Sequence, residues 1–378
     1  MNFDYSADQR LLKDEARRFL DGCCSPAVVR GVLDDASRSY DAGLWTQLAD
    51  MGWLGSVLPE AHGGLGLGHV ELCAIAEEMG RVLAPVPFAS TLYFFAQALM
   101  QFGTEEQQAH WLPQVASGDC IGCFAAAEGA GEPIPARLQA SVEGGRLRGD
   151  KIPVIDGDVA HVAIVLAQGE QGPGLFLVDL REPGVKRAPL ASLDPTRGLA
   201  GLSFADVAAE QLGRPGEGLR IATQVYRRAA ALLAFEQIGG ADRCLEMAKT
   251  FALERYAFGR PIASYQAIKH KLAEVYVRNE LARSNAYYAA WALDKDVDGH
   301  EMPIAAAAAR IAASDAYWHA AKENIQTHGG MGFTWEVDAH LYYRRAQQLA
   351  LAAGAPRWWK EHLATELESR HVGAPEEV

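Results

Sequence analysis

A change in the hydrophobic pattern of the sequence near residue 120 constrains the fold of this chain more than any other feature. Residues 121 to about 214 carry short apolar runs broken by Gly and Pro, such as residues 159–167 and 175–178. Residues 140–147, with Gly144 and Gly145 at their centre, have the signature of a β-hairpin. No helical pattern separates these runs. An antiparallel sheet or barrel is therefore favoured over a Rossmann unit, whose parallel strands need crossover helices.

The residues on both sides of this β region have helical periodicity. Residues 1–119 open with Ser6 and Gln9 at the spacing of a helix cap, and a second cap pattern begins at Thr104. After Gly218, apolar stripes predict helices near 219–257, 265–295, 302–328 and 336–369. These stripes are broad, which indicates that the helices also pack against another subunit. We expect an α+β chain with an N-terminal helical domain, a middle antiparallel β domain and a C-terminal four-helix bundle, at residues 1–119, 120–214 and 215–378.

Composition and charge exclude several classes of function. The chain has 378 residues and a formal net charge of -13, which argues against nucleic acid or an anionic membrane surface as the main partner. Cys120 and Cys123 form a Cys-x-x-Cys pair without a second pair at zinc spacing, so we interpret them as buried thiols and expect no metal site. The sequence opens without a signal-peptide pattern and has no uncharged run near the length of a membrane span. A soluble cytoplasmic protein is the expectation.

The stretch from Arg255 to Gln266 carries the clearest chemistry. An apolar-periodic helix runs up to Arg255, Pro261 cannot continue it, and a second helix is predicted from about Ser264. Arg255 and Gln266 would therefore lie at the facing ends of two helices. A guanidinium suits a phosphate, and an amide can both donate and accept hydrogen bonds, so the pair suits a dinucleotide. The alternative interpretation is that both residues are solvated helix ends.

Four segments match motifs of a known family in the same order along the chain. Residues 59–64 contain Pro-Glu-x-x-Gly-Gly, and residues 76–80 are Ala-Glu-Glu-Met-Gly. Residues 255–266 fit Arg-x-x-Phe-Gly-x-x-Ile-x-x-x-Gln, and residues 326–333 fit Gln-x-x-Gly-Gly-x-Gly-Phe. Together with the order of helical and β regions, these motifs make nearly the whole chain resemble the acyl-CoA dehydrogenase family.

The resemblance implies a reaction and a cofactor. The implied reaction is α,β-desaturation of an acyl-CoA thioester, in which a carboxylate removes the α-proton while the β-hydrogen leaves as hydride to FAD. An electron-transferring flavoprotein is the implied electron acceptor. In the family, the first of the two longer motifs holds the FAD pyrophosphate across a dimer interface, and the second lies along the adenosine half. The cofactor-binding residues implied for this chain are Arg255, Phe258, Gln266, Gln326, Gly329 and Gly330.

Other segments depart from the family pattern. The family's usual base is a Glu in a Tyr-Glu-Gly-Thr segment, and Ala353 stands in its place. Some relatives place the base early in the first bundle helix, where residues 229–230 are both Ala. Pro153 and Ile155 replace the aromatic and hydroxyl residues of the family's Trp-Ile-Thr/Ser segment, which lies against the flavin ring. Residues 127–132 replace the family's Thr-Glu-x-x-x-Gly-Ser segment.

Glu236 is the candidate base that remains, because it lies inside an apolar helix where a buried carboxylate could accept a proton. A structural role is the alternative, in which the carboxylate pairs with an Arg or caps a neighbouring helix. We interpret His270 and His328 as structural or nucleotide-edge residues, and Trp358 and Trp359 as packing residues.

The pattern of kept and lost segments favours a subunit of a heteromeric acyl-CoA dehydrogenase. In some relatives that act on bulky acyl-CoA esters such as sterol side chains, one chain supplies the base while the other has a degenerate site. Residues 255–266 and 326–330 would then complete the FAD site of a second, catalytic chain. Two alternatives stay open. One is a homo-oligomer that uses Glu236 as its base, and the other is a non-catalytic scaffold or regulatory paralogue.

Overall fold

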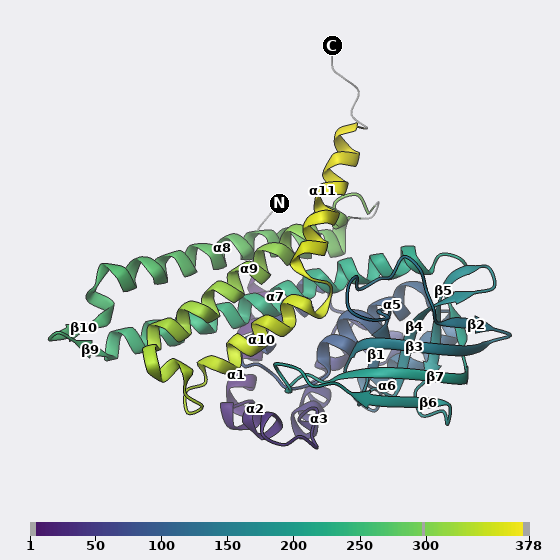
Figure 1. Cartoon of the computed structure of the whole chain (residues 1–378), viewed down its shortest axis with the longest axis horizontal. Helices are drawn as coiled ribbons and strands as arrows, with labels where there is room; N and C mark the ends of the chain where they lie inside the picture. The colour runs from purple at the N-terminus through teal and green to yellow at the C-terminus, as the bar shows by residue number, and fades with distance from the viewer. Residues whose placement is uncertain (1–4, 297–298, 373–378) are drawn as a thin grey trace, which may run out of the picture. The chain divides into compact units, whose positions relative to one another are not determined.

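A computed structural model describes residues 5–296 and 299–372 and confirms the order of helices, strands and helices (Figure 1). The predicted caps are present, because Ser6 Oγ accepts from the Gln9 N–H and Thr104 Oγ1 accepts from the Gln107 N–H. The N-terminal elements are α1 (Ala7–Cys23), α2 (Pro26–Leu33), α3 (Ala42–Asp50), η1 (Trp53–Gly55), η2 (Glu60–His62), α4 (His69–Arg81), the π-helical η3 (Ala89–Phe95), α5 (Ala96–Phe102) and α6 (Glu105–Ala116).

The middle of the chain forms an eight-stranded sheet in the order β6-β7-β3-β2-β4-β5-β8, with β1 paired to β4. Its strands are β1 (Gly122–Ala125), β2 (Ser141–Glu143), β3 (Arg146–Ile155), β4 (Val162–Gly169), β5 (Gly172–Asp179), β6 (Val185–Pro189), β7 (Leu199–Ala208) and β8 (Glu210–Leu212). Gly144 and Gly145 form the predicted hairpin turn with φ of 53° and 72°. Most neighbours pair antiparallel as expected, whereas β1 and β2 pair parallel to β4. Neither β1 nor β2 joins β4 through a tight hairpin, so the chain can return in the same direction.

The C-terminal helices are α7 (Gly218–Glu254), α8 (Gln266–Lys295), α9 (Met302–His328), α10 (Ala339–Ala352) and α11 (Pro356–Val372). The expectation of one continuous helix over 336–369 is wrong. The helix is interrupted between Ala352 and Pro356, where Gly354 has a φ of 95° that a helix does not tolerate. This break contains Ala353, which the sequence predicts at the position of the family's usual base.

The chain divides into two compact units, each built from segments far apart in sequence. One unit combines α1, α4 and the helical residues from 230 onward, and the other combines residues 27–68 with 85–229. The three-domain division at 119/120 and 214/215 stays a prediction.

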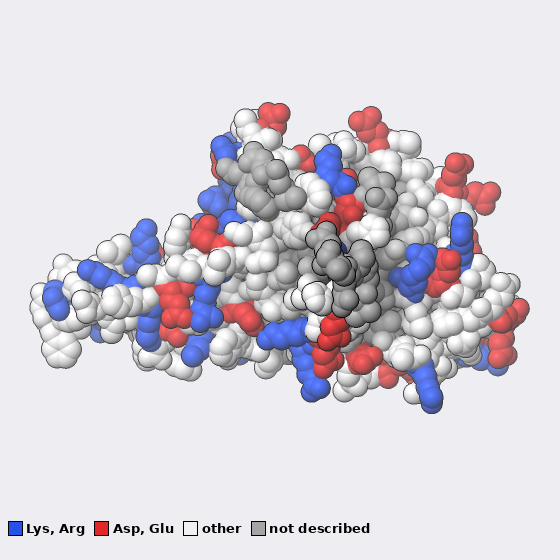
Figure 2. Space-filling view, turned by 90° about the horizontal axis from the view of Figure 1, so that it is seen from above, with Lys and Arg blue, Asp and Glu red and all other residues white. Residues whose placement is uncertain are grey.

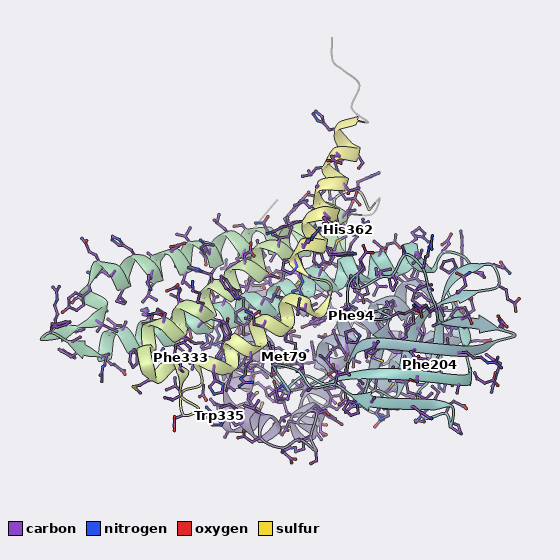
Figure 3. The ribbon with its side chains drawn as sticks, viewed as in Figure 1. Met79, Phe94, Phe204, Phe333, Trp335 and His362 are labelled. Carbon is purple, nitrogen blue, oxygen red and sulfur yellow. The ribbon has the colours of Figure 1, made fainter. Side chains whose placement is uncertain are left out.

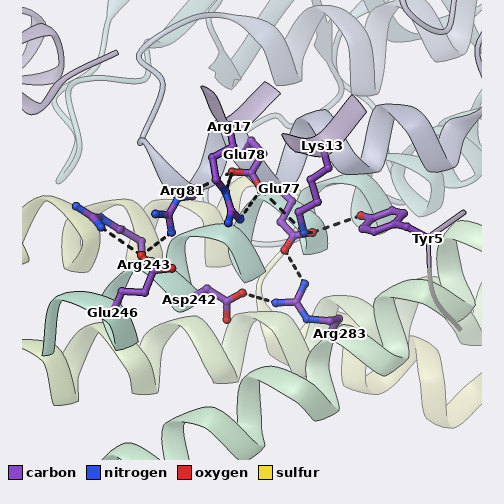
Figure 4. A network of polar contacts seen from close by, with 10 residues as sticks. All are labelled: Tyr5, Lys13, Arg17, Glu77, Glu78, Arg81, Asp242, Arg243, Glu246 and Arg283. Atoms are coloured by element: carbon purple, nitrogen blue, oxygen red, sulfur yellow. Dashed lines mark hydrogen bonds and ion pairs between the residues drawn. The ribbon is translucent and has the colours of Figure 1, made fainter. Parts of the chain in front are cut away.

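An ion-pair network joins α1, α4 and α8 within the first unit (Figure 4). Glu77 is 2% exposed, and its carboxylate lies 2.5 Å from the Lys13 ammonium and 2.5 Å from the Arg283 guanidinium. Glu78 accepts hydrogen bonds of 3.0 and 2.8 Å from Arg17. Because buried charges are tolerated only when paired, the two carboxylates of the Ala-Glu-Glu-Met-Gly motif hold these helices together.

Gly80, the glycine at the end of that motif, allows the backbones of α4 and α7 to come into direct contact. A Cβ on Gly80 would lie 1.8 Å from the carbonyl oxygen of Glu236, and a Cβ on Gly239 would lie 1.8 Å from that of Glu77. Both distances are far below a van der Waals contact, so neither position accepts a side chain. The crossing fixes Glu236 in the interior of the first unit.

Two features bear on the other sequence expectations. Cys120 and Cys123 are buried free thiols, as expected. Within the described ranges, no helix is long and apolar enough to cross a membrane.

Candidate functional site

The residues between α7 and α8 form a tight hairpin at one end of these helices (Figure 1). Its strands are β9 (Tyr256–Ala257) and β10 (Arg260–Pro261), and Ala257 pairs with Arg260. The two turn residues, Phe258 and Gly259, have φ of 51° and 80°. Two positive φ values are typical of the type I′ turn, which matches the natural twist of paired strands. The hairpin therefore separates the predicted residues Arg255 and Gln266, and both remain at helix ends.

The hairpin and the helix ends beside it leave polar side chains and a large aromatic side chain exposed to solvent. Arg255 and Gln266 are exposed, and the Phe258 side chain is 98% exposed. A fully exposed aromatic ring in the left-handed backbone region is unfavourable in water, because it gains no burial and requires a strained backbone. Such a residue is better explained by a contact made outside this chain.

Positive charge gathers along the same part of the chain. Residues 249–271 contain five Lys or Arg residues and one Glu, although the whole chain has a formal net charge of -13. On the face seen in Figure 2, the outermost charged side chains at the left-hand end, which holds β9 and β10, are Lys and Arg. This end of the helices therefore suits an anionic ligand.

The second predicted segment lies at the end of α9, in the turn η5 (Gly329–Phe333). Gln326, Gly329 and Gly330 are all exposed. Gly329 has a φ of 61°, which explains a glycine there. Gly330 has no such constraint, and a Cβ added to it would meet nothing within 4 Å.

One aromatic contact brings this segment to the hairpin. The ring of His328 lies on the ring of Phe251, with centroids 4.3 Å apart, and Phe251 is one helical turn before Arg255. His328 Nδ1 also lies 2.8 Å from the Asn324 carbonyl oxygen. These contacts fit a structural role for His328, and they place both predicted segments at the same end of α7 and α9.

Large apolar side chains extend this exposed surface. Phe333 is 80% exposed and Trp335 48% exposed, and both lie in the connection between α9 and α10 (Figure 3). On α8, Val277 and Leu281 are exposed on successive turns of one helix face, beside Tyr276. Leu281 therefore lies outside the core.

The position predicted for the family's usual base has no proton-accepting side chain. Ala353 is fully buried in the break between α10 and α11, and its carbonyl oxygen accepts a 2.9 Å hydrogen bond from Trp359 Nε1. Trp358 and Trp359 are buried, as expected for packing residues. The segment between α10 and α11 is therefore fixed by its own packing and hydrogen bonding. The side chain at its centre is a methyl group.

Glu236, the candidate base, lies in a buried cluster with two Arg residues. Its carboxylate is 3.6 Å from the Arg345 guanidinium. Arg310 is also fully buried and donates a 2.5 Å hydrogen bond to the side-chain oxygen of Gln237. Burial lowers the pKa of Arg310 to about 9, although the nearby Glu236 carboxylate acts in the opposite direction. Of the two roles that the sequence left open, this geometry favours the ion pair with an Arg.

The two altered segments of the β region lie side by side. The Ile152 N–H donates to the Ala127 carbonyl at 2.9 Å, and the Gly129 N–H donates to the Ile152 carbonyl at 2.8 Å. The buried Lys151 ammonium lies 2.6 Å from the Glu128 carboxylate. Burial lowers the pKa of Lys151 to about 8, while Glu128 favours its charged form. The two segments are thus hydrogen-bonded to each other, and Pro153, which is predicted to replace the family's aromatic residue, is exposed.

Comparison with known proteins identifies the family. The acyl-CoA dehydrogenase N-terminal domain matches residues 6–119, and the C-terminal domain matches residues 216–367. The chain is 32% identical to the acyl-CoA dehydrogenase IpdE2 of Mycobacterium tuberculosis, over 95% of this chain and 97% of that protein. The chain belongs to the acyl-CoA dehydrogenase family. It is accordingly related to oxidoreductases that act on acyl-CoA thioesters.

Two solved structures share the fold. One, described as a variant of the Tcur3481–Tcur3483 steroid ACAD, superposes with a TM-score of 0.88 at 31% identity and covers 97% of this chain and 99% of that chain. The other, the ChsE4–ChsE5 complex of Mycobacterium tuberculosis, has a TM-score of 0.88 at 29% identity and covers 99% of this chain and all of that chain. These matches confirm the predicted fold class.

FAD is the cofactor of the acyl-CoA dehydrogenase family, and the end of α7, α8 and α9 fits part of it. The exposed Arg255 guanidinium suits a pyrophosphate, and the open surface at Gly330 permits close approach of a nucleotide. Two further residues near this end were not predicted from the sequence: Arg260 in the hairpin and Tyr265 directly before α8. The sequence features that could have indicated them are an Arg directly after the Phe-Gly turn and an aromatic residue directly before Gln266.

Proposed function

We propose that this chain is a subunit of a heteromeric acyl-CoA dehydrogenase and completes the FAD site of a different, catalytic chain. The proposal rests on which residues of the site are kept and which are replaced. Arg255, Gln266 and Gln326, which resemble residues acting across a subunit interface, are kept and exposed. Ala353 and Pro153 stand where a chain would supply its own base and its own flavin-ring contact.

The exposed end of α7, α8 and α9 supports a ligand held on another chain. Arg255, Phe258 and Gly330 each have a feature that no contact within the described part of the chain explains. These features are a solvent-facing cation in a basic stretch, a 98% exposed ring, and a glycine without steric need. An FAD pyrophosphate and its surrounding protein would explain all three.

The exposed apolar residues support a partner subunit. Val277 and Leu281 on α8, together with Phe333, are large side chains that a monomer leaves in water. Burying them against a second chain would stabilise the complex at about 25 cal/mol per Å² of apolar surface removed from water. The similarity to the ChsE4–ChsE5 complex supports a different family member as that chain.

The chemistry is divided between the two chains in this proposal. FAD supplies the hydride acceptor, and the partner chain supplies the carboxylate base and the surface of the acyl pocket. The residues of this chain would bind and orient FAD. Arg255 would neutralise the pyrophosphate, and Gln266 and Gln326 would hydrogen-bond the polar edges of the dinucleotide. Gly329 and Gly330 would allow close approach of the adenosine half. The similarity to a steroid ACAD favours a bulky, steroid-derived acyl-CoA as the substrate. We also propose an electron-transferring flavoprotein as the acceptor and the cytoplasm as the site of action.

The test co-expresses this chain with a family member that has an intact base and Trp-Ile-Thr/Ser segment. Arg255→Ala in this chain is expected to lower the FAD content of the purified complex at least tenfold, since it removes a charge-assisted bond to phosphate. Arg278→Ala is the matched control, because Arg278 is exposed on α8 and pairs only locally with Glu274 among the contacts described. Full FAD content in the Arg255→Ala complex would refute the shared site.

The homomeric alternative makes a different prediction. A homo-oligomer that uses Glu236 as its base would be yellow and active when purified alone, and Glu236→Gln would abolish turnover. A scaffold paralogue would show no turnover with any co-encoded family member. The ion pair between Glu236 and Arg345 and the loss of the flavin-ring residues favour the heteromer over the homo-oligomer. Turnover of the co-expressed complex separates the heteromer from the scaffold.

A further inference from the structure

The hairpin between α7 and α8 has two chemically different faces. Ala257 pairs with Arg260 and Tyr256 pairs with Pro261. The Ile262 N–H donates to the Arg255 carbonyl at 2.8 Å, which extends the pairing by one position. Because side chains alternate along a strand and directly opposed residues share a face, Arg255 and Arg260 project from the same face. Tyr256 and Pro261 project from the other.

The two Arg residues on this face are diagonal neighbours. Diagonal positions of an antiparallel pair lie about 7–8 Å apart at the backbone, within reach of long side chains. Both residues are exposed, and the one acidic residue of the surrounding stretch, Glu254, precedes Arg255 in α7. One face of the hairpin therefore presents two guanidinium groups to a ligand outside the chain.

Arg260 differs from an ordinary surface Arg because an aromatic ring holds it. Its guanidinium carbon lies 4.1 Å from the centroid of the Tyr265 ring. The Tyr265 hydroxyl in turn donates a 2.8 Å hydrogen bond to the Ala257 carbonyl, on the strand opposite Arg260. Tyr265 thus ties the start of α8 to the hairpin and orients the Arg260 head group. A guanidinium stacked on a ring loses less conformational freedom when it binds an anion.

We propose that Arg260 is a second pyrophosphate-binding cation, positioned by Tyr265 beside Arg255. A pyrophosphate carries two anionic phosphoryl groups, so two adjacent guanidinium groups match its charge better than one. The apolar face, with Tyr256 and Pro261, is left to pack against the chain that carries the flavin. This inference rests on the proposed function, because the ligand is the FAD of a partner chain.

The experiment measures FAD binding by the co-expressed complex after removal of its flavin, using the change in flavin fluorescence on titration. Arg255→Ala is the benchmark and Arg278→Ala the control. Arg260→Ala is expected to weaken FAD binding about tenfold or more, and Arg260→Lys less, because Lys keeps the charge but not the planar fork. Tyr265→Leu is expected to weaken binding about threefold to tenfold, and Tyr265→Phe less, since Phe keeps the ring beneath Arg260.

The outcomes separate this inference from the proposed function. If Arg255→Ala weakens FAD binding and Arg260→Ala does not, the second cation is refuted and the shared site stands. If neither variant changes the affinity, both ideas fall. Native mass checks that each variant complex assembles. Should Arg260→Ala prevent assembly, Arg260→Gln carries the test, because its planar amide can still pack on Tyr265 while the charge is gone. Unchanged FAD affinity in an assembled Arg260→Gln complex would overturn the inference.

Discussion

The carboxylate of Glu236 lies 3.6 Å from the guanidinium of Arg345, and each side chain is 1% exposed. The two residues come from α7 and α10, and Arg345 also donates a 3.3 Å hydrogen bond to the Leu83 carbonyl. A carboxylate enclosed in this way balances buried positive charge. A base must instead reach a substrate proton directly or through one water molecule. The relationship therefore assigns Glu236 to the stability of the first unit.

Glu236→Gln is expected to lower the free energy of unfolding by about 3–5 kcal/mol, because it leaves buried guanidinium groups without their carboxylate. Turnover per bound flavin in the assembled complex is expected to stay unchanged. Denaturant unfolding and steady-state kinetics measure the two effects separately. Glu361→Gln, in an exposed pair with Arg357, is the control and should change neither quantity. Loss of turnover at unchanged stability would show that Glu236 is the base.

Glu77→Gln tests the ion-pair network of α1, α4 and α8. Burial alone would raise the pKa of Glu77, but Lys13 and Arg283 outweigh it and hold this pKa below its usual range. The folded state therefore favours the ionised carboxylate, and its contribution to stability is present above the ordinary pKa and lost as pH falls through the lowered one. We expect a loss of about 3–5 kcal/mol at pH 7, and a smaller difference between the two proteins below about pH 4. A difference independent of pH would contradict this assignment.

Gly239→Ala tests the backbone contact between α4 and α7. The added Cβ would meet the Glu77 carbonyl oxygen at 1.8 Å, so the helices must separate, and we expect a loss of several kcal/mol, at or above the upper end of overpacking costs of about 1–3 kcal/mol. Gly22→Ala is the matched control, because it lies in α1 with nothing within 4 Å of the new Cβ. There the higher helix propensity of Ala should stabilise the chain by about 0.5–1 kcal/mol. Thermal unfolding of both variants gives the comparison. Equal shifts of the melting temperature would contradict a close backbone contact between α4 and α7 at Gly239.

Much of the fold could be predicted because local patterns determine it. The caps at Ser6 and Thr104 and the glycine turn at Gly144 each depend on residues close in sequence, and all three are present. The break at Gly354 was missed, because an isolated glycine in an apolar pattern does not show whether its φ is positive. Parallel pairing of β1 with β4 depends on contacts distant in sequence, which no local pattern encodes.

The candidate site could be predicted only in part, for the same reason. Arg255 and Gln266 could be placed at two facing helix ends from the spacing alone, whereas their binding role came from the resemblance to the family and stays a prediction. The pairing of Glu236 with Arg345 depends on the packing of α7 against α10, and neither residue indicates the other in the sequence. The stacking of Arg260 on Tyr265 likewise depends on the hairpin folding back toward α8.

Asp156→Asn tests the surroundings of the altered flavin-ring segment. Burial raises the pKa of Asp156 from 3.8 to about 6, although Arg197 and a 2.6 Å hydrogen bond from Ser90 favour the ionised form. The folded state binds a proton more tightly than the unfolded state, so ionisation of Asp156 between these two values costs stability. The unfolding free energy of the unsubstituted chain, relative to Asp156→Asn, should therefore fall by up to about 3 kcal/mol between about pH 4 and pH 6 and stay level above. Asn tolerates the φ of 54° at this position, so the backbone is preserved. A relative stability that rises over this range would contradict the assignment.

The most direct test of the shared site is a visible absorbance spectrum combined with native mass, for this chain alone and co-expressed with a family member that has an intact base. The account predicts that the chain alone is colourless. It predicts that the co-expressed particle contains both chains, with about one flavin for each pair, because only one chain of the pair keeps its own flavin-ring contacts. A yellow particle made of this chain alone would contradict the account and return Glu236 to consideration as the base.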